Sequence, residues 1–227
     1  MINVISADAD DFCWVDCFVV DFYLVHFIIY IQSSKVVCIG RNYVDHIKEL
    51  NNETPAEPVI FMKPNSAISD QITINDNDAI HYEGEISFVV NNGKLDAVGF
   101  GLDLTKREIQ TKLKGKGLPW ERAKAFDGSA VFSEFAPVEG NMEDLRLELW
   151  INGELIQSGG VDLMLYKPTE ILAEINTFST LEDGDIIMTG TPKGVGVINF
   201  GDEFIGKIYN NNTLLVERTW VVQKSNK

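Results

Sequence analysis

The chain has 227 residues, of which 45% are hydrophobic and 23% are charged, a composition typical of a soluble globular protein. Its length allows one large domain with a substantial core. A formal net charge of −15 argues against nucleic acid as a partner, because phosphate binding depends on a basic surface. The three cysteines, Cys13, Cys17 and Cys38, do not suit a disulfide framework, so we expect a reducing, cytoplasmic setting.

Residues 1–34 differ from the rest of the chain, because they contain five aspartates and no lysine or arginine. The apolar run from Phe12 to Ile31 is nearly long enough to span a bilayer. Asp16 and Asp21 oppose that reading, since they would cost roughly 5 to 7 kcal/mol at the centre of a span. A β-rich packing segment, an appendage or mis-assigned start, and a membrane anchor all remain open, with the anchor the least expected. We treat 1–34 as an extension and 35–227 as the main domain.

The elements predicted after this extension are those of one α+β domain. Strands are expected over residues 35–40, 58–64, 80–90, 98–104, 145–151, 154–159 and 185–190. Helices are expected to begin within 41–52 and to cover much of 106–114 and 169–180. Thr105 is a plausible N-cap for the second helix. Asn152-Gly153 predicts a tight hairpin, and a last hairpin should turn at Asn211-Asn212. The third helix is predicted to bury Ile171, Leu172, Ile175 and Phe178 on one side.

Three acidic residues lie where two neighbouring strands could bring them together. Glu83 and Glu85 are two positions apart, and residues at that spacing in a strand point to the same face. Asp103 comes from the next predicted strand. Three carboxylates offer the hard oxygen ligands that suit Mg²⁺ or Mn²⁺. The alternative is that alternating acids simply form the solvated face of a strand.

Six motifs, taken in chain order, resemble those of the fumarylacetoacetate hydrolase family, in particular its small acylpyruvase and oxaloacetate-decarboxylase-like members. They are CIGRNYVDHIKEL, PVIFMKP, HYEGEISFVV, GLDLTKREIQ, KGLPWERAKAFD and LEDGDIIMTGTPKGVG. The resemblance covers most of the chain from Lys35 to about Val222. It implies a mixed β-roll with a few short helices, a catalytic domain over 35–227, and a homodimer. The extension has no counterpart in the family pattern, the stretch between Ile74 and Ile80 is short, and Gly84 replaces a bulkier residue.

The resemblance also implies catalytic roles. Glu83, Glu85 and Asp103 match the metal carboxylates, which supports the strand argument. His46 and Glu49 match a catalytic dyad on a lid, in which Glu49 would orient His46 as a general base. From the residues alone, a surface histidine at the start of a helix is the favoured interpretation of His46, and the resemblance reverses that preference. Lys124 matches a lysine that points into the site and would stabilise charge on a carbonyl oxygen.

Four further residues are assigned to substrate binding. Arg107, Gln110 and Thr191 match family positions that contact substrate or support the metal ligands, although Arg107 could equally form an outward ion pair. Arg41 lies beside the lid motif and could pair with a substrate carboxylate. For Lys63, a charge at the end of a strand is an equally good interpretation.

The predicted function is divalent-metal-dependent hydrolysis of a C–C bond in 2,4-diketo acids of the acylpyruvate or fumarylpyruvate type, releasing pyruvate, with oxaloacetate decarboxylation as a related activity. The first alternative is a metal-dependent isomerase or tautomerase of oxo-dienoic diacids or oxaloacetate, which shares the enolate. The second alternative is a non-catalytic, membrane-associated binding protein. In the catalytic cases the partner is a small anionic keto acid.

Overall fold

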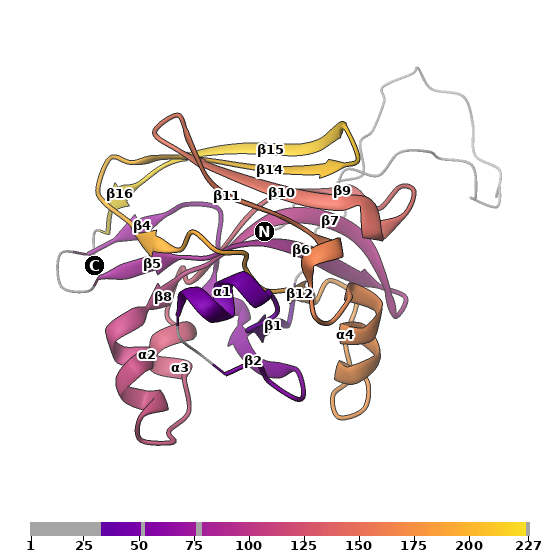
Figure 1. Cartoon of the computed structure of the whole chain (residues 1–227), viewed down its shortest axis with the longest axis horizontal. Helices are drawn as coiled ribbons and strands as arrows, with labels where there is room; N and C mark the ends of the chain where they lie inside the picture. The colour runs from indigo at the N-terminus through magenta and orange to yellow at the C-terminus, as the bar shows by residue number, and fades with distance from the viewer. Residues whose placement is uncertain (1–32, 51–52, 76–78, 226–227) are drawn as a thin grey trace, which may run out of the picture.

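The structure is a computed structural model that describes residues 33–50, 53–75 and 79–225. The predictions for residues 1–32 therefore lie outside the described residues. Two sheets carry most of the strands (Figure 1). The larger sheet contains, in spatial order, β2 (Val59–Pro64), β1 (Lys35–Gly40), β12 (Ile186–Met188), β6 (Gly84–Asn91), β7 (Lys94–Asp103), β9 (Ala130–Pro137) and β3 (Ile68–Ser69). The second contains β11 (Glu154–Gly160), β10 (Leu145–Ile151), β14 (Glu203–Asn210) and β15 (Thr213–Val221).

Short strands and helices complete the described fold. One small sheet contains β13 (Gly196–Val197), β5 (Ile80–Tyr82) and β8 (Thr105–Lys106), and another pairs β16 (Gln223–Lys224) with β4 (Thr73–Ile74). The α-helices are α1 (Val44–Glu49), α2 (Arg107–Lys114), α3 (Glu121–Lys124) and α4 (Pro168–Ile175). Single 3₁₀ turns occur at η1 (Asn65–Ala67), η2 (Met142–Asp144) and η3 (Val161–Leu163). No helix of the described ranges is long and apolar enough to cross a membrane.

The second sheet packs over the central strands of the larger one, while α1 to α4 lie on the opposite side (Figure 1). Strand β10 turns alternate residues inward, as its leucines at 145, 147 and 149 are buried and the residues between them are half-buried. Phe100 of β7 fits against Gly206 of β14, where an added Cβ would lie 2.3 Å from the ring. The two sheets therefore approach closely because one position has no side chain.

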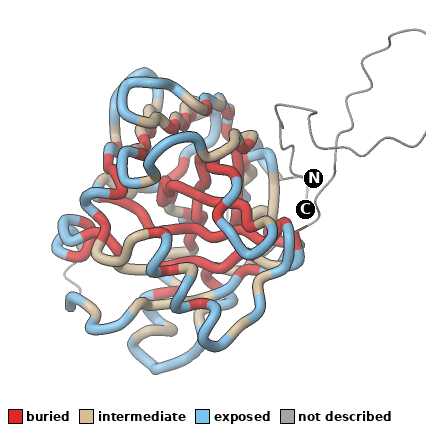
Figure 2. The backbone as a smooth tube through the Cα atoms, turned by 90° about the vertical axis from the view of Figure 1, so that its right-hand side faces the viewer, coloured by how far each residue is buried: buried red, intermediate tan, exposed pale blue. Residues whose placement is uncertain are grey.

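Strands β6 and β7 run through the middle of the molecule and are buried along nearly their whole length (Figure 2). Both faces are covered, so residues on both faces of these strands are buried, among them the polar side chains of Glu85, Ser87 and Asp103. They pair antiparallel, with Gly84 opposite Leu102 and Glu85 opposite Gly101. This register places the beginning of β6 beside the end of β7, which is where the three predicted metal ligands lie.

Most local predictions agree with the structure. The predicted strands correspond to β1, β2, β5–β6, β7, β10, β11 and β12, and Asn152-Gly153 joins β10 to β11 with positive φ at both residues. Asn211 turns between β14 and β15. The prediction for Phe178 was wrong: α4 ends at Ile175, and Phe178 is 56% exposed. The apolar spacing of a helix cannot show where the helix stops.

Asp185 fastens the beginning of the described chain to β12. Its carboxylate accepts hydrogen bonds from the backbone N–H groups of Ser34, Lys35 and Glu182 and from the Ser34 hydroxyl, and it pairs with the Lys35 ammonium. Burial raises the pKa of Asp185, but these donors outweigh burial and lower it below its ordinary value. The ionised carboxylate thus holds β1 in its parallel register with β12.

Candidate metal and active site

The three predicted ligand carboxylates meet at one point. Oxygen atoms of Glu83, Glu85 and Asp103 lie within 4.8 Å of one another, and all three residues are buried. Glu83 immediately precedes β6, Glu85 is its second residue, and Asp103 ends β7. The Asp103 N–H donates to the Glu83 carbonyl over 2.9 Å, so the backbone fixes the spacing of the cluster.

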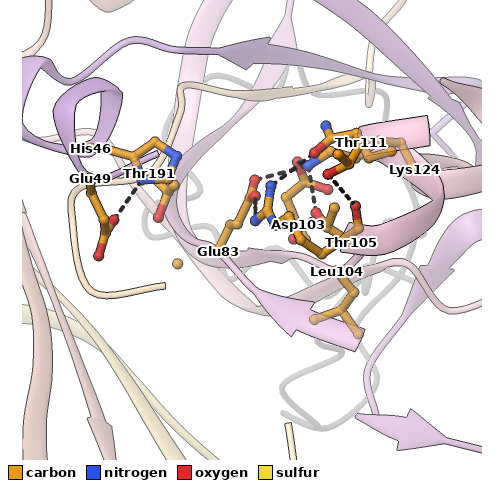
Figure 3. A network of polar contacts seen from close by, with 12 residues as sticks. His46, Glu49, Glu83, Asp103, Leu104, Thr105, Thr111, Lys124 and Thr191 are labelled. Carbon is orange, nitrogen blue, oxygen red and sulfur yellow. Dashed lines mark hydrogen bonds and ion pairs between the residues drawn. The ribbon is translucent and has the colours of Figure 1, made fainter. Parts of the chain in front are cut away.

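Lys124 of α3 reaches into this cluster, as predicted (Figure 3). Its ammonium donates to Glu83 Oε2 at 2.9 Å, to Asp103 Oδ2 at 2.5 Å and to Thr105 Oγ1 at 2.6 Å. Thr105 is not the N-cap of α2, because Lys106 occupies that position. The Thr105 hydroxyl accepts the hydrogen bond from Lys124 instead. Burial alone would lower the pKa of Lys124, but Asp103 and Glu83 raise it well above its ordinary value.

Arg107 points inward rather than forming an outward ion pair. Its guanidinium pairs with Glu83 and donates to Gln110 Oε1 at 2.8 Å, so both predicted residues of α2 belong to the group. Burial would raise the pKa of Glu83, yet Lys124 and Arg107 together hold it well below its usual range. Glu83 is consequently a carboxylate with two cationic partners.

Lys63 is a residue that the sequence argument undervalued. Its side chain is completely buried, and its ammonium lies 2.8 Å from Asp103 Oδ1. It also donates to the Ser129 carbonyl at 2.9 Å and to the carbonyl of Lys124. The sequence signal that could have identified Lys63 was a charged residue among the apolar residues of β2. Lys63 joins β2 to both a metal ligand and the helix that carries Lys124.

Glu85, the third predicted ligand, shows whether a divalent cation suits this site. Burial and the neighbouring charges of Asp103 and Glu83 raise the pKa of Glu85 well above its ordinary value, and the Gly190 N–H, which donates to Glu85 Oε2 at 2.7 Å, only partly offsets this. Asp103 Oδ1 is buried without a well-directed hydrogen bond, although Lys63 is close. A hard cation would satisfy both groups at once. The residues present therefore suit Mg²⁺ or Mn²⁺.

The predicted dyad is formed on α1. His46 Nδ1 and Glu49 Oε2 are 3.0 Å apart, and His46 is buried. The other oxygen of Glu49 accepts the Gly194 N–H at 2.9 Å, which fastens α1 to the glycine-rich loop. Figure 3 shows the dyad on one side of Glu83 and Lys124 on the other side. His46 is thus oriented toward the carboxylate cluster and is not a surface histidine.

Thr191 is buried beside this loop and is held by Gln157, a residue that no sequence signal indicated. Gln157 Nε2 donates to Thr191 Oγ1 and to the Pro192 carbonyl, each at 2.8 Å, while its Oε1 accepts the Gly84 N–H at 2.9 Å. A Cβ on Gly84 would lie 3.0 Å from both Gln157 and Phe100, so a side chain here would require these neighbours to shift by a few tenths of an ångström. One amide thereby links the metal-ligand strand to the loop of Thr191.

The remaining predicted residue, Arg41, lies in the turn between β1 and α1. Its φ of 58° is unusual for a residue with a side chain, and its buried Nε has no hydrogen-bond partner among the described residues. Among the described residues, no hydrogen bond or ion pair joins Arg41 to the carboxylate cluster.

Comparison with known proteins agrees with this geometry. The sequence profile of the family described as "Fumarylacetoacetate (FAA) hydrolase C-terminal" matches residues 35–218. The chain belongs to the fumarylacetoacetate hydrolase family. It is 40% identical over 188 residues to oxaloacetate tautomerase YcgM of Escherichia coli, covering 75% of this chain and 86% of that protein. It is 37% identical over 213 residues to human oxaloacetate tautomerase FAHD1, mitochondrial, covering 85% and 93% of the two chains.

A solved relative extends the comparison to ligands. The crystal structure of fumarylpyruvate hydrolase from Pseudomonas aeruginosa in complex with Mn²⁺ and pyruvate superposes with a TM-score of 0.78 at 27% identity, covering 85% of this chain and 91% of that chain. The predicted sheet-dominated α+β fold with a few short helices is confirmed. The protein is an enzyme of this family, and its buried acidic triad fits a divalent metal.

Proposed function

We propose that the protein is a divalent-metal-dependent enzyme that enolises a 2-oxo acid, with keto–enol tautomerisation of oxaloacetate as its reaction. The observation that carries this proposal is the charge balance of the buried cluster. When Glu83, Glu85 and Asp103 are all ionised, their three negative charges equal the three positive charges of Lys63, Lys124 and Arg107, so the group has no net charge before a metal binds.

Adding a divalent cation leaves two positive charges in a buried site. A substrate with two negative charges restores neutrality, which favours a dicarboxylate or the enolate of a 2-oxo acid. The names of the relatives, two of which are oxaloacetate tautomerases, support the same substrate class. The bound metal would supply Lewis-acid polarisation of the 2-oxo oxygen and the adjacent carboxylate.

The chain's own groups can move the proton. His46, oriented by Glu49, would accept a proton from C3 of oxaloacetate and return it to the 2-oxo oxygen, so that the keto and enol forms interconvert with no bond to carbon broken except C–H. Gln157 donates to the Thr191 oxygen, so the Thr191 hydroxyl would donate to the substrate carboxylate in place of its long, 3.4 Å contact with the Pro192 carbonyl. Lys124 would place positive charge near the developing enolate.

Hydrolysis of an acylpyruvate is the second candidate, favoured by the same dyad. His46 would take a proton from water, hydroxide would add to the 4-carbonyl, and the C3–C4 bond would break with its electron pair going to C3. The products would be a carboxylic acid and pyruvate. The fumarylpyruvate hydrolase structure with pyruvate supports this chemistry for a protein of the same fold.

One experiment separates these reactions. Oxaloacetate and acetylpyruvate are supplied with Mg²⁺ or EDTA, and enol absorbance, CO₂ and pyruvate are followed, with an enzyme-free control for spontaneous enolisation. Metal-dependent keto–enol exchange without CO₂ or pyruvate is expected. Glu83→Gln should remove it, and Glu108→Gln, on the exposed face of α2, should not. Pyruvate from acetylpyruvate alone would favour the hydrolase, and inactivity with both acids despite bound Mg²⁺ would refute the proposal.

A further inference from the structure

Lys114, the last residue of α2, is a half-buried cation with no anionic partner. Its ammonium lies 4.7 Å from the centroid of the Trp120 ring. Among the described residues it forms no ion pair and no hydrogen bond. The protein has 34 acidic residues against 19 lysines and arginines, so an inward-facing lysine left without an acid is unexpected on charge alone. Such a group is suited to bind an anion that is not part of the chain.

The surroundings of Lys114 are also positive. Burial, together with the charges of Arg41 and Lys124, lowers its pKa to about 8. Arg41 has a buried, unpartnered Nε and likewise forms no ion pair among the described residues. The Arg41 charge opposes that of Lys114, and an anion bound by both would convert this repulsion into attraction.

Aromatic rings connect this place to the metal cluster. Lys114 lies over Trp120, the rings of Trp120 and Phe61 are 5.8 Å apart, and the Lys124 ammonium is 5.0 Å from the Phe61 ring. Beside these rings is a cavity of about 280 Å³ whose lining includes Phe61, Trp120 and Lys124. The two rings thus form an apolar wall between Lys124, which contacts Glu83 and Asp103, and the second cation, Lys114.

We propose that Lys114 and Arg41 form a carboxylate subsite that binds the far end of a 2-oxo dicarboxylic acid whose 2-oxo acid end lies at Glu83, Glu85 and Asp103. The inference rests on the proposed function and extends it. It selects dicarboxylates over acids with one carboxylate, such as acetylpyruvate. The subsite would give oxaloacetate a contact that a monocarboxylate of equal length cannot make.

The test compares matched ligands that differ only in the far carboxylate. Binding of 2-oxoglutarate and 2-oxopentanoate to the Mg²⁺-loaded full chain is measured by calorimetry, and initial rates are measured with oxaloacetate. Lys114→Met should weaken 2-oxoglutarate binding by about 10- to 100-fold, because it removes a charge-assisted hydrogen bond to the far carboxylate. Binding of 2-oxopentanoate should change less than about twofold, because this ligand makes no such contact. Arg41→Gln should act in the same direction, and Lys114→Arg should restore most of the affinity.

The matched control is Lys112→Met, which removes the same charge from an exposed position of the same helix and should leave both affinities unchanged. Equal losses for the two ligands in Lys114→Met, or an unchanged preference for the dicarboxylate, would overturn the subsite. Wild-type protein that binds both ligands equally would also overturn it while leaving the proposed function intact. Wild-type protein that binds Mg²⁺ but neither ligand and does not enolise oxaloacetate would overturn both.

Discussion

Glu85→Gln is the substitution for which the structure makes the sharpest prediction, because it should change the metal-free and metal-loaded proteins in opposite directions. Glu85 is 1% exposed and lacks the cationic partners that Glu83 and Asp103 possess. Glutamine has nearly the same shape, and its carbonyl can still accept the Gly190 N–H. The substitution therefore removes one charge with little change in packing.

The size of the effect follows from the distances in the cluster. Two unit charges about 4.8 Å apart interact by roughly 3.5 kcal/mol at an effective dielectric constant of about 20. Ionised Glu85 is repelled in this way by Glu83 and Asp103, and the nearby lysines cancel much of that cost. A net stabilisation of about 2 kcal/mol is expected for metal-free Glu85→Gln at pH 8, equivalent to a rise in Tm of roughly 4 to 8 °C.

The sign of the pH dependence is fixed by the raised pKa of Glu85. Ionisation of a carboxyl with a raised folded-state pKa costs stability, and this cost grows as pH rises from the unfolded pKa through the folded one. In EDTA, the Tm advantage of Glu85→Gln should thus be small in acid and larger at alkaline pH. Mg²⁺ affinity of the wild type should fall as pH decreases, because a proton competes for Glu85.

The assay is thermal unfolding of both proteins from pH 5 to 9, in EDTA and in Mg²⁺, with Glu108→Gln as the control. Mg²⁺ should raise the Tm of the wild type and of the control but not of Glu85→Gln, so the order of stabilities reverses when metal is added. A metal-free variant less stable than the wild type at pH 8, or one stabilised by Mg²⁺ as strongly as the wild type, would refute the assignment of Glu85 as an uncompensated ligand.

Three further substitutions test other parts of the argument. His46→Ala should lower kcat by about 10²- to 10⁴-fold in the enol-exchange assay while Mg²⁺ affinity from calorimetry stays unchanged, and an unchanged rate would exclude His46 as the base. Gly84→Ala should destabilise the protein by about 1 to 3 kcal/mol in urea unfolding, because its methyl group meets Phe100 and Gln157; no loss would mean that the packing relaxes. Asp185→Asn should cost about 1 to 3 kcal/mol at pH 7. Because the pKa of Asp185 is lowered, this difference should shrink as pH falls through that pKa, and a difference independent of pH would contradict the role of its charge.

The local patterns of the sequence were sufficient for much of this protein. Strands were predicted over 80–90 and 98–104, where most of β6 and β7 lie, and Asn152-Gly153 predicted a hairpin, because these features depend on residues close together in the chain. The spacing of Glu83 and Glu85, with Asp103 from the next strand, predicted the carboxylate cluster. That prediction worked because antiparallel neighbours joined by a short turn bring such positions together.

The partners of those carboxylates were decided only by tertiary structure. Lys63 lies on an edge strand forty positions before Asp103, and Thr105 accepts a hydrogen bond from Lys124 instead of capping a helix. Gln157, from the second sheet, joins the first residue of β6 to the loop of Thr191. Their sequence contexts are ordinary, because their roles arise where segments distant in the chain pack against each other. The sequence by itself determined which groups could bind a metal. The packing of the two sheets and of α1 to α3 determined which cations balance them and shifted the pKa of Glu83 down and that of Glu85 up.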